Sequence, residues 1–528
     1  MIPAIRPRLA PSPALLLAAL AGALSTLSFA PLGWWGLQFI TLAALFALVE
    51  RAATVRQAAL LGWAFSFGWM AGGIWWLFIS LHRYGGLPAW IAVAAVLLLA
   101  TVMGLYAAAS MGAGRWLQQR GASRAVLLLV ALPVLWMLSE WVRGWLFTGF
   151  PWIVSGYAHT DGVLAGFAPL VGVYGIGWLA ALLAGCIVLR DRRALAMAIL
   201  VIAAGLGLAQ VSWTQPHGKP ISVRLLQGNV PQEMKFAHGQ VQAALDMYRQ
   251  MMTEQAADLV ATPETALPML AHRLPADYLP MLQQFATRTG SHVLLGIPVS
   301  DGPDNYANSV LGFAPSPALA ANAPQAAPAP GPAAAYRYDK HHLVPFGEFI
   351  PPGSLWFVRM MNIPLGDFTR GRLLQAPFTV KDQRVLPNIC YEDLFGEEIA
   401  EQLADRWFAG ELPATILLNL SNIAWFGDTI ALPQHLQISR MRSLETGRPM
   451  LRSTNTGVTA VIDHRGAVAA RLPDNQRATL AAQVQGMQGW TPYMLGGNLP
   501  ILALAAALLL LTWRALRRTS TSGAGKTR

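Results

Sequence analysis

Eight long apolar runs dominate the pattern of the chain, and seven of them lie within its first 211 residues. Each approaches the ~20 residues that an α-helix needs to cross the hydrocarbon of a bilayer. The runs, whose ends the pattern places only to within several residues, are Ala14–Phe29, Trp34–Val49, Ala58–Leu81, Trp90–Ala113, Ala125–Met137 extending toward Trp145, Val163–Leu189, Ala194–Val211 and Leu499–Trp513. We therefore predict an α-helical polytopic membrane domain of about eight spans, in which the second and last runs are short for a span.

Between the seventh and eighth runs the pattern changes to that of an extramembrane α/β domain. Short runs rich in β-branched residues alternate with stretches of helical periodicity, as in strands buried on both faces. The predicted strands are Ser222–Gln227, Leu259–Thr262, His292–Ile297, Ser309–Phe313, Arg384–Ile389, Ala414–Leu420, Pro449–Ser453, Thr459–Ile462 and Leu480–Val484. The predicted helices are Gln240–Ala256, Ala276–Arg288 and Gln434–Thr446. The chain then divides into a membrane domain (1–215), an α/β domain (220–488) and a last span with a basic tail (489–528).

Two stretches interrupt the α/β pattern. Ala314–Ala335 is rich in Ala and Pro, a composition that predicts a surface loop without a core. Phe349–Phe368 carries large apolar residues between polar motifs, including Trp356, Phe357 and Met360. This second segment is either an insertion that packs into the core or a lid that dips into the bilayer surface, and the sequence leaves both readings open.

Composition and charge support a membrane protein. The 528 residues are 54% hydrophobic and 12% charged, which is too apolar for a water-soluble chain. The net charge of +11 does not indicate nucleic-acid binding, because the Arg residues cluster at the ends of apolar runs. In an eight-span arrangement these clusters fall on one side, and the opposite short loops offer only Arg83 and Arg143. The positive-inside rule therefore predicts cytoplasmic termini and an α/β domain on the outer side, with the first run retained as a signal anchor.

The chain has two cysteines, and their positions differ in meaning. Cys186 lies in an apolar run and Cys390 in the α/β domain, so we expect no disulfide between them. An unpaired thiol in an oxidising compartment is a liability unless its reactivity is used. Because a single cysteine is more often a small buried hydrophobe than a nucleophile, the case for Cys390 depends on its neighbours.

Three polar segments lie at predicted strand ends or in loops marked by Pro or Gly, where rigid scaffolds hold reactive groups. They are Thr262–Pro268, Tyr338–Glu348 and Leu386–Asp393. Together they offer a workable set for acyl transfer. A carboxylate takes the thiol proton, an ammonium stabilises thiolate and oxyanion, and a thiol attacks the acyl carbon. A backbone N–H after the cysteine, where we expect a helix to begin at Asp393, would complete an oxyanion hole.

Each member of this set also has a plainer interpretation. Glu264 alone would fit a helix cap or a surface charge, and Lys340 alone would fit a solvated side chain. Glu348 and Glu392 would fit supporting or capping carboxylates. Spacing along the chain does not show that these side chains meet.

The order Glu, Lys, Cys in these contexts resembles the nitrilase, or carbon–nitrogen hydrolase, superfamily, whose fold is an αββα sandwich. Flanking motifs make the resemblance closer, and they are Gln227–Gln232, Lys340–Glu348, Cys390–Glu392, Asn419–Asp428 and Arg440–Gly457. With apolar runs on both sides, nearly the whole chain resembles the apolipoprotein N-acyltransferases, a membrane-embedded family of that superfamily. The resemblance implies a nitrilase-like αββα sandwich for the extramembrane domain.

The same resemblance implies roles for individual residues. Glu264 would be the general base, Lys340 the partner of thiolate and oxyanion, and Cys390 the nucleophile. The supporting or substrate-binding positions would be Glu348, Tyr391, Glu392, Asn422, Trp425 and Phe426, the two aromatic residues lining the pocket or its entrance. Phe236 departs from the family, which often has Trp there; Phe keeps an aromatic face but lacks the indole N–H.

The implied reaction is a ping-pong acyl transfer through a thioester on Cys390. The donor would be a membrane phospholipid, and the acceptor the α-amino group of a diacylglyceryl-cysteine at the N-terminus of an apolipoprotein. The resemblance implies no cofactor, a place in the bacterial inner membrane with the α/β domain periplasmic, and a monomer. No metal site is predicted, because His341 and His342 have no further His or Cys at ligand spacing.

Two other functions remain as alternatives. A membrane-anchored amidase or nitrilase would use water as acceptor, but it needs no lipid entrance, so seven preceding spans would be excessive. A transporter with an external binding domain would need more ionisable residues within its spans than Glu140 and Arg143.

Overall fold

The computed structural model describes residues 11–232, 240–303, 305–316, 336–360 and 367–524. The chain forms two compact units. The helical unit comprises Met1–Phe78, Ala89–Val211 and Gly496–Arg528, and the α/β unit comprises Ile79–Pro88 and Ser212–Leu495. The short stretch Ile79–Pro88 thus lies among the helices in sequence but belongs to the α/β unit.

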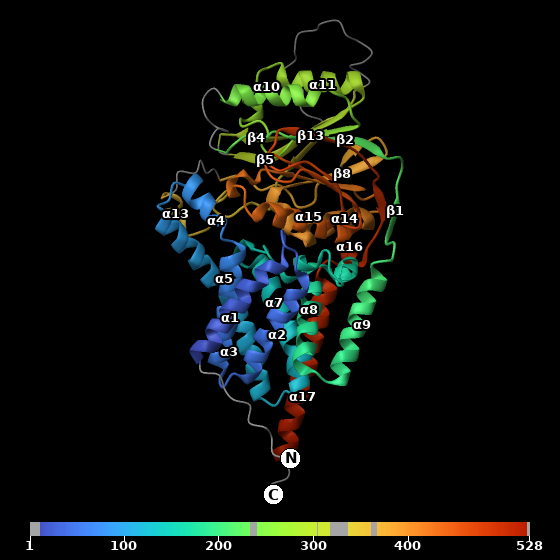
Figure 1. Cartoon of the computed structure of the whole chain (residues 1–528). Helices are drawn as coiled ribbons and strands as arrows, with labels where there is room; N and C mark the ends of the chain where they lie inside the picture. The colour runs from blue at the N-terminus through green and yellow to red at the C-terminus, as the bar shows by residue number, and fades with distance from the viewer. Residues whose placement is uncertain (1–10, 233–239, 304, 317–335, 361–366, 525–528) are drawn as a thin grey trace. The chain divides into compact units, whose positions relative to one another are not determined.

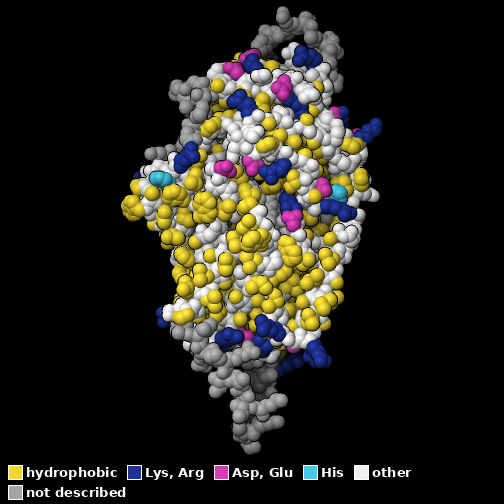
Figure 2. Space-filling view, in the orientation of Figure 1, with side chains coloured by type: hydrophobic (Ala, Val, Ile, Leu, Met, Phe, Trp, Pro, Cys, Tyr) yellow, Lys and Arg dark blue, Asp and Glu magenta, His cyan; other side chains and the backbone are white. Residues whose placement is uncertain are grey.

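The helical unit is built from long apolar helices. They are α1 (Pro11–Ser25), α2 (Trp35–Arg51), α3 (Val55–Gly73), α5 (Ala89–Gln119), α7 (Leu132–Trp145), α8 (Ala168–Leu189), α9 (Arg192–Leu208) and α17 (Leu499–Ala524), with the short α4 (Leu77–Ile79) after α3 and the short α6 (Arg124–Val126) before α7. Figure 2 shows mostly hydrophobic side chains over these helices, with Lys and Arg gathered at one end. Small residues let the helices approach closely, since a Cβ on Gly62 would lie 2.4 Å from the carbonyl oxygen of Ala107.

Four helices in the described part of the chain are long and apolar enough to cross a membrane. A fifth follows if α3 and the stretch Leu77–Tyr84 count as one span, although the two are bent by 62°. The third predicted run, Ala58–Leu81, is therefore not one straight helix. The other seven runs each hold a helix, but α2 and α9 have only 17 residues each. The structure supports a polytopic helical domain, and the count of eight spans stays a prediction.

The α/β unit contains two six-stranded sheets, each with a parallel centre. The first has the order β13 (Ala478–Val484), β2 (Ile221–Gln227), β3 (Leu259–Ala261), β4 (His292–Gly302), β5 (Asn305–Phe313), β6 (Tyr336–Asp339). The second has the order β12 (Val468–Arg471), β11 (Ala460–Ile462), β10 (Met450–Thr454), β9 (Ile416–Ser421), β8 (Gln383–Ile389), β7 (Phe378–Val380). Strands β2, β3 and β4 are mutually parallel, as are β8, β9 and β10.

The two sheets stack face to face and are covered by helices on their outer sides (Figure 1). Val223 and Leu225 of β2 enter the core between the sheets, whereas Leu226 enters the core beneath α10 (Gln240–Thr253) and α11 (Tyr278–Thr289). The second sheet packs in the same way against α14 (Gly396–Phe408) and α15 (Ala431–Thr446). The strands are buried on both faces, which explains their continuous apolar runs. The predicted αββα sandwich is confirmed.

All nine predicted strands are present, with ends shifted by a few residues at most in all but β4 and β5. The pattern missed the short edge strands β6, β7 and β12, and also the separate pair β1 (Thr214–Pro216) and β14 (Met487–Gly489). Edge strands of three or four residues carry too little alternation to stand out from loops. Among those missed, β6 leads directly into Lys340.

Candidate active site

Glu264 lies just beyond the end of β3, in the middle of the first sheet. The Thr262 hydroxyl accepts a hydrogen bond from the Gly296 N–H at 2.9 Å, which ties the turn to β4. Gly296 must be glycine here, because a Cβ would lie 2.1 Å from the carbonyl oxygen of Pro263. The turn thus holds a buried carboxylate at the carboxyl end of a parallel strand, a common place for functional groups.

Lys340 lies one residue beyond β6, and its side chain reaches two carboxylates. Its Nζ is 3.2 Å from Glu264 Oε1 and 2.9 Å from Glu348 Oε1. Asn308 Nδ2 donates to the same two oxygens, at 2.8 and 2.9 Å. The backbone N–H of Val344 donates to the other Glu348 oxygen at 2.9 Å. An ammonium and an amide therefore fix both carboxylates in a site where Lys340 is only 1% exposed.

Cys390 follows the last residue of β8 and has a left-handed backbone, with φ of +53°. A non-glycine residue in that region costs roughly 1–3 kcal/mol, and such strain is typical of functional turns. The Cys390 carbonyl oxygen accepts from Asn419 Nδ2 at 3.2 Å and lies 3.3 Å from His435 Nε2. The expected helix does not begin at Asp393: a 3₁₀ helix covers Cys390–Leu394, and α14 begins at Gly396. The structure thus turns the nucleophile candidate sharply out of its strand.

The electrostatic surroundings keep Cys390 protonated at rest. Burial and the neighbouring charge of Glu264 raise the pKa of the thiol well above its ordinary value, and Lys340 acts in the opposite direction. Burial alone would lower the pKa of Lys340, but Glu264 and Glu348 outweigh it and hold that pKa above its usual range. The site is therefore a partly buried thiol beside a fixed ammonium and a carboxylate that can take its proton.

Glu392 joins the Cys390 turn to the Lys340 loop. Its carboxylate accepts from the backbone N–H of Ile389 at 2.6 Å and from that of His341 at 2.6 Å, and the Tyr338 hydroxyl donates to it at 3.1 Å. Burial raises the pKa of Glu392 to about 7, against the effect of the Ile389 N–H. The residue acts as a brace between two loops.

Tyr391 is also buried, and its ring lies among others. The ring centroids of Tyr391 and Phe395 are 5.3 Å apart, and those of Tyr391 and His342 are 5.8 Å apart. The side chain therefore packs beside the Cys390 turn.

The loop after β9 supplies a further contact to the site. The backbone N–H of Asn422 donates to Glu264 Oε2 at 2.8 Å and also acts to lower the pKa of the Cys390 thiol. Gln232 and Asn455 hold the Asn422 side chain, each at 3.0 Å. A 3₁₀ helix, η9 (Ile423–Phe426), follows directly and carries Trp425 and Phe426, both partly exposed. The motifs that were far apart in sequence meet here.

The remaining predicted positions are described only in part. Phe236 lies outside the described residues, and so do 361–366 of the predicted lid and most of the Ala/Pro-rich loop. Leu355–Val358 forms one short helix, α13, in which Trp356 is 68% exposed and Phe357 packs against Phe346 with centroids 5.7 Å apart. Met360 is 44% exposed. These exposed apolar side chains favour the prediction that the segment is a lid over the alternative that it packs into the core.

Sequence reasoning missed two features of the site. Asn308 was not singled out, although an Asn in a buried strand was a usable signal. A fully buried cluster of Asp393, His435 and Arg452 behind Cys390 was also missed. Arg452 donates to His435 Nδ1 at 2.9 Å and lies 3.2 Å from Asp393. Because an arginine cannot accept, His435 must carry its proton on Nε2, which lies 3.1 Å from Asp393 Oδ1 and 3.3 Å from the Cys390 carbonyl oxygen.

Replacing Arg452 should destabilise the fold, because it would leave Asp393 buried without its cation. We expect Arg452→Met to lower the free energy of unfolding by about 3–5 kcal/mol. Arg471→Met is the matched control, since Arg471 pairs with Asp474 at 2.8 Å on the surface and should cost less than about 1 kcal/mol. Thermal unfolding of both variants in detergent measures the difference. Equal melting temperatures would contradict the assigned role of the cluster.

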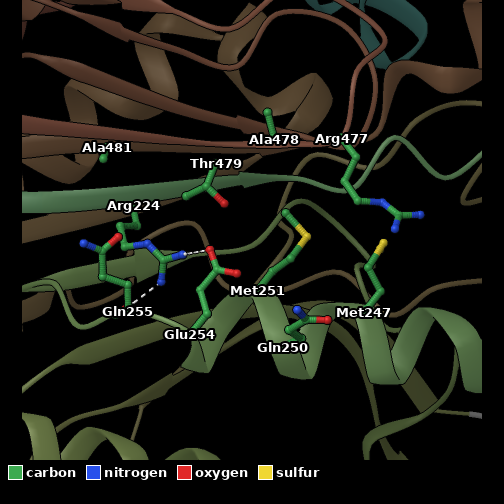
Figure 3. A pocket seen from close by; sticks show the side chains of 10 residues that line it. All are labelled: Arg224, Met247, Gln250, Met251, Glu254, Gln255, Arg477, Ala478, Thr479 and Ala481. Atoms are coloured by element: carbon green, nitrogen blue, oxygen red, sulfur yellow. Dashed lines mark hydrogen bonds and ion pairs between the residues drawn. The ribbon is translucent and has the colours of Figure 1, made fainter.

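A separate cavity of about 490 Å³ lies between α10 and β13 (Figure 3). Glu264, Lys340 and Cys390 are not among the residues that line it. Its lining includes Arg224, whose Nη2 is 2.7 Å from Glu254 and whose Nη1 donates to the Gln255 carbonyl oxygen. Because the arginine is already paired, we assign no chemistry to it. Among the described residues, no group of three or more His, Cys, Asp or Glu side chains has the arrangement of a metal site.

Family comparisons cover most of the chain. Residues 21–186 match the apolipoprotein N-acyltransferase N-terminal domain, and residues 222–491 match the carbon-nitrogen hydrolase domain.

Two relatives are similar over nearly the full length. An apolipoprotein N-acyltransferase of Ralstonia nicotianae is 52% identical, covering 95% of this chain and 93% of the relative. One of Bordetella bronchiseptica is 42% identical, covering 94% and 96%. The solved structure of Saccharomyces cerevisiae Nit3, from branch 10 of the nitrilase superfamily, aligns at 16% identity and a TM-score of 0.36, covering 51% of this chain and 91% of that one.

Proposed function

Because this chain belongs to the apolipoprotein N-acyltransferase family, we propose that Cys390 is its nucleophile, Glu264 its general base and Lys340 its electrostatic catalyst. The enzyme is an acyltransferase of lipoprotein maturation, with lipid and lipoprotein substrates. The observation that carries the assignment of residues is the convergence of a buried ammonium, a buried carboxylate and a thiol on three separate loops.

In the first half-reaction the Cys390 sulfur attacks an ester carbonyl carbon of a phospholipid. As the S–C bond forms, the thiol proton passes to Glu264, and the negative charge moves to the carbonyl oxygen, which Lys340 stabilises. The ester C–O bond then breaks, and Glu264 returns its proton to the leaving lysophospholipid oxygen. The products are a thioester and a lysophospholipid.

In the second half-reaction the free α-amino group of a diacylglyceryl-cysteine attacks the thioester carbon. Glu264 takes a proton from the attacking nitrogen, the C–S bond breaks, and the sulfur recovers a proton. An amide and the free enzyme result. Lys340 and Glu264 are almost fully enclosed, which limits the water that can compete with the amine for the thioester beside them.

The experiment that tests this assignment is intact mass spectrometry of the purified protein after exposure to phospholipid. We expect a mass increase of one acyl chain, mapped by peptide analysis to Cys390 and removed by hydroxylamine. Addition of a diacylglyceryl-cysteine peptide should discharge the adduct as acylated peptide. Release of free fatty acid at the same rate without peptide would favour a hydrolase instead.

Supporting roles follow from the hydrogen bonds. We assign Glu348 and Asn308 to the orientation of Lys340 and Glu264, and Glu392 to the brace between the Lys340 and Cys390 loops. Tyr391 packs beside the Cys390 turn, and Asn422 presents its N–H to Glu264. Trp425 and Phe426 would line the acyl site. Phe236 keeps its predicted aromatic role in substrate binding as a proposal from the sequence alone.

The membrane arrangement rests on the charge pattern. We propose eight spans, cytoplasmic termini, a periplasmic catalytic unit in the bacterial inner membrane, and a monomer. What supports it is the clustering of Arg residues in alternate loops, together with the apolar surface of the helices (Figure 2). Labelling of single cysteines introduced at Arg51 and Arg115 from the inner side only would agree with this arrangement.

The exposed apolar residues in the described part of the predicted lid, Trp356 and Met360 among them, should gate the lipid substrates. Changing Trp356 and Phe357 together to Ser should reduce turnover of long-chain phospholipid about tenfold or more, because the lid would lose its contact with the bilayer. A short-chain, water-soluble ester donor should be affected much less, since it needs no membrane contact. Turnover of both donors is the measurement. Equal loss with both, together with a melting temperature lower by many degrees, would make the segment part of the core.

A further inference from the structure

The stretch Ile79–Pro88 comes from between two helices of the helical unit, yet it packs as part of the α/β unit. Its centre is a single turn of π-helix, Ser80–Tyr84, closed by the Gly85 N–H donating to the Ser80 carbonyl oxygen at 2.8 Å. Isolated π-helical turns are rare and frequently occur at functional sites. The contacts of this turn show which part of the α/β unit it positions.

The turn holds the loop that follows β9. The Ser80 hydroxyl donates to the Trp425 carbonyl oxygen at 2.7 Å. The Tyr84 ring meets the Trp425 ring edge to face, with centroids 5.6 Å apart. Ile79 lies against Gly427, where φ is +62° and an added Cβ would come within 3.3 Å of the Ile79 side chain. The turn thus fixes both the backbone and the ring of Trp425.

This loop is also tied to the reacting groups. Three residues before Trp425, the Asn422 N–H donates to Glu264 Oε2 at 2.8 Å, and it also acts to lower the pKa of the Cys390 thiol. The intervening residues are buried, whereas Trp425 keeps part of its surface exposed. The loop is therefore tied to the general base through Asn422, and the Trp425 ring is held by Tyr84. A large apolar ring in that position is suited to line the path of an acyl chain bound at Cys390.

We propose that Tyr84 and Ser80 are positioning residues that hold the Trp425 indole as a wall of the acyl site and so determine which acyl chain lengths are used. This inference rests on the proposed function, because it takes Cys390 as the acylated residue. Ser80 and Tyr84 act through their contacts with Trp425. Their loss should weaken contacts along the chain rather than the chemistry at the carbonyl.

The test compares two donors in single-turnover acylation of the full-length protein in mixed micelles. The donors are phosphatidylglycerol with C16 chains and phosphatidylglycerol with C8 chains, and the readout is the rate of adduct formation on Cys390 by intact mass. Tyr84→Ala should lower the C16-to-C8 rate ratio by about fivefold or more, with the C8 rate changed less than about threefold. Tyr84→Phe keeps the ring and should keep the wild-type ratio.

A double-mutant cycle shows whether the effect passes through Trp425. Trp425→Ala should itself lower the ratio, and adding Tyr84→Ala to it should change the ratio little further. A full additional loss in that background would overturn the proposal, as would an unchanged ratio in Tyr84→Ala. If Tyr84→Ala does not fold, Ser80→Ala removes only one hydroxyl and carries the same comparison.

The outcomes separate this inference from the proposed function. If the wild-type protein forms no adduct on Cys390 with either donor, the assignment of the nucleophile fails. If the wild-type protein forms the adduct and the ratio does not respond to Tyr84→Ala or Ser80→Ala, only the role of the turn fails.

Discussion

Cys390→Ala should abolish both half-reactions, with acyl transfer reduced by about 10⁴-fold or more, because no other group near Glu264 and Lys340 in the described site can form the thioester. Cys390→Ser should leave traces at most, since a hydroxyl is a far weaker acid than a thiol. Intact mass after exposure to phospholipid should show no acyl adduct on the alanine variant.

Cys186→Ala is the matched control for this prediction. Cys186 lies in α8 of the helical unit and is buried among apolar residues, where no group activates it. Its variant should form the adduct at nearly the wild-type rate. Near wild-type transfer by Cys390→Ala, or loss of transfer by a folded Cys186→Ala, would contradict the assignment.

Glu264→Gln should slow acylation of Cys390 by about 10²–10⁴-fold while leaving phospholipid binding nearly unchanged. The pKa of the Cys390 thiol is raised by burial, so the proton must be removed during attack, and an amide cannot accept it. Lys340→Met should slow acylation comparably by removing the charge that faces the developing oxyanion. Single-turnover acylation kinetics, with binding measured separately, check both.

Two variants elsewhere in the α/β unit serve as controls. Glu254→Gln makes the same substitution at a half-exposed glutamate that pairs with Arg224. Lys381→Met makes the same substitution at an exposed lysine that pairs with Asp258. Both should acylate within about twofold of wild type, since the partners of these side chains are Arg224 and Asp258 and not the groups around Cys390. An unchanged rate of thioester formation in Glu264→Gln or Lys340→Met would mean that the triad is misassigned.

The central strands and the positions of Glu264 and Cys390 could be predicted from the sequence. The parallel strands of a sandwich are apolar throughout, so β3 and β8 stood out, and the residues just beyond them had to lie at the carboxyl edges of two facing sheets. The order of Glu, Lys and Cys then limited the chemistry. What spacing could not show was the distance between the three side chains.

The rest of the site depends on interactions between distant segments. Lys340 follows an edge strand too short to recognise, and its loop is held by Glu392, which comes 52 residues later. The positive φ of Cys390 has no sequence signal, because cysteine does not favour that region. The break after Gly73 was also hidden, since an apolar run reads the same whether its helix is straight or bent.

The two carboxylates and single ammonium around Cys390 have a consequence for the acceptor. Glu264, Glu348 and Lys340 together carry one negative charge when the site is at rest. When the thiol attacks, its proton neutralises Glu264 as the oxyanion forms. The single negative charge therefore moves from Glu264 to the oxyanion and stays within a region of low dielectric constant. An acceptor that arrived as ammonium would break this balance, because Glu264 can take one proton and the nitrogen would have two to lose. The lipoprotein amine must therefore shed its first proton to water, and the rate of the second half-reaction should follow the ionisation of that amine, near pH ~8 for an ordinary α-amino group.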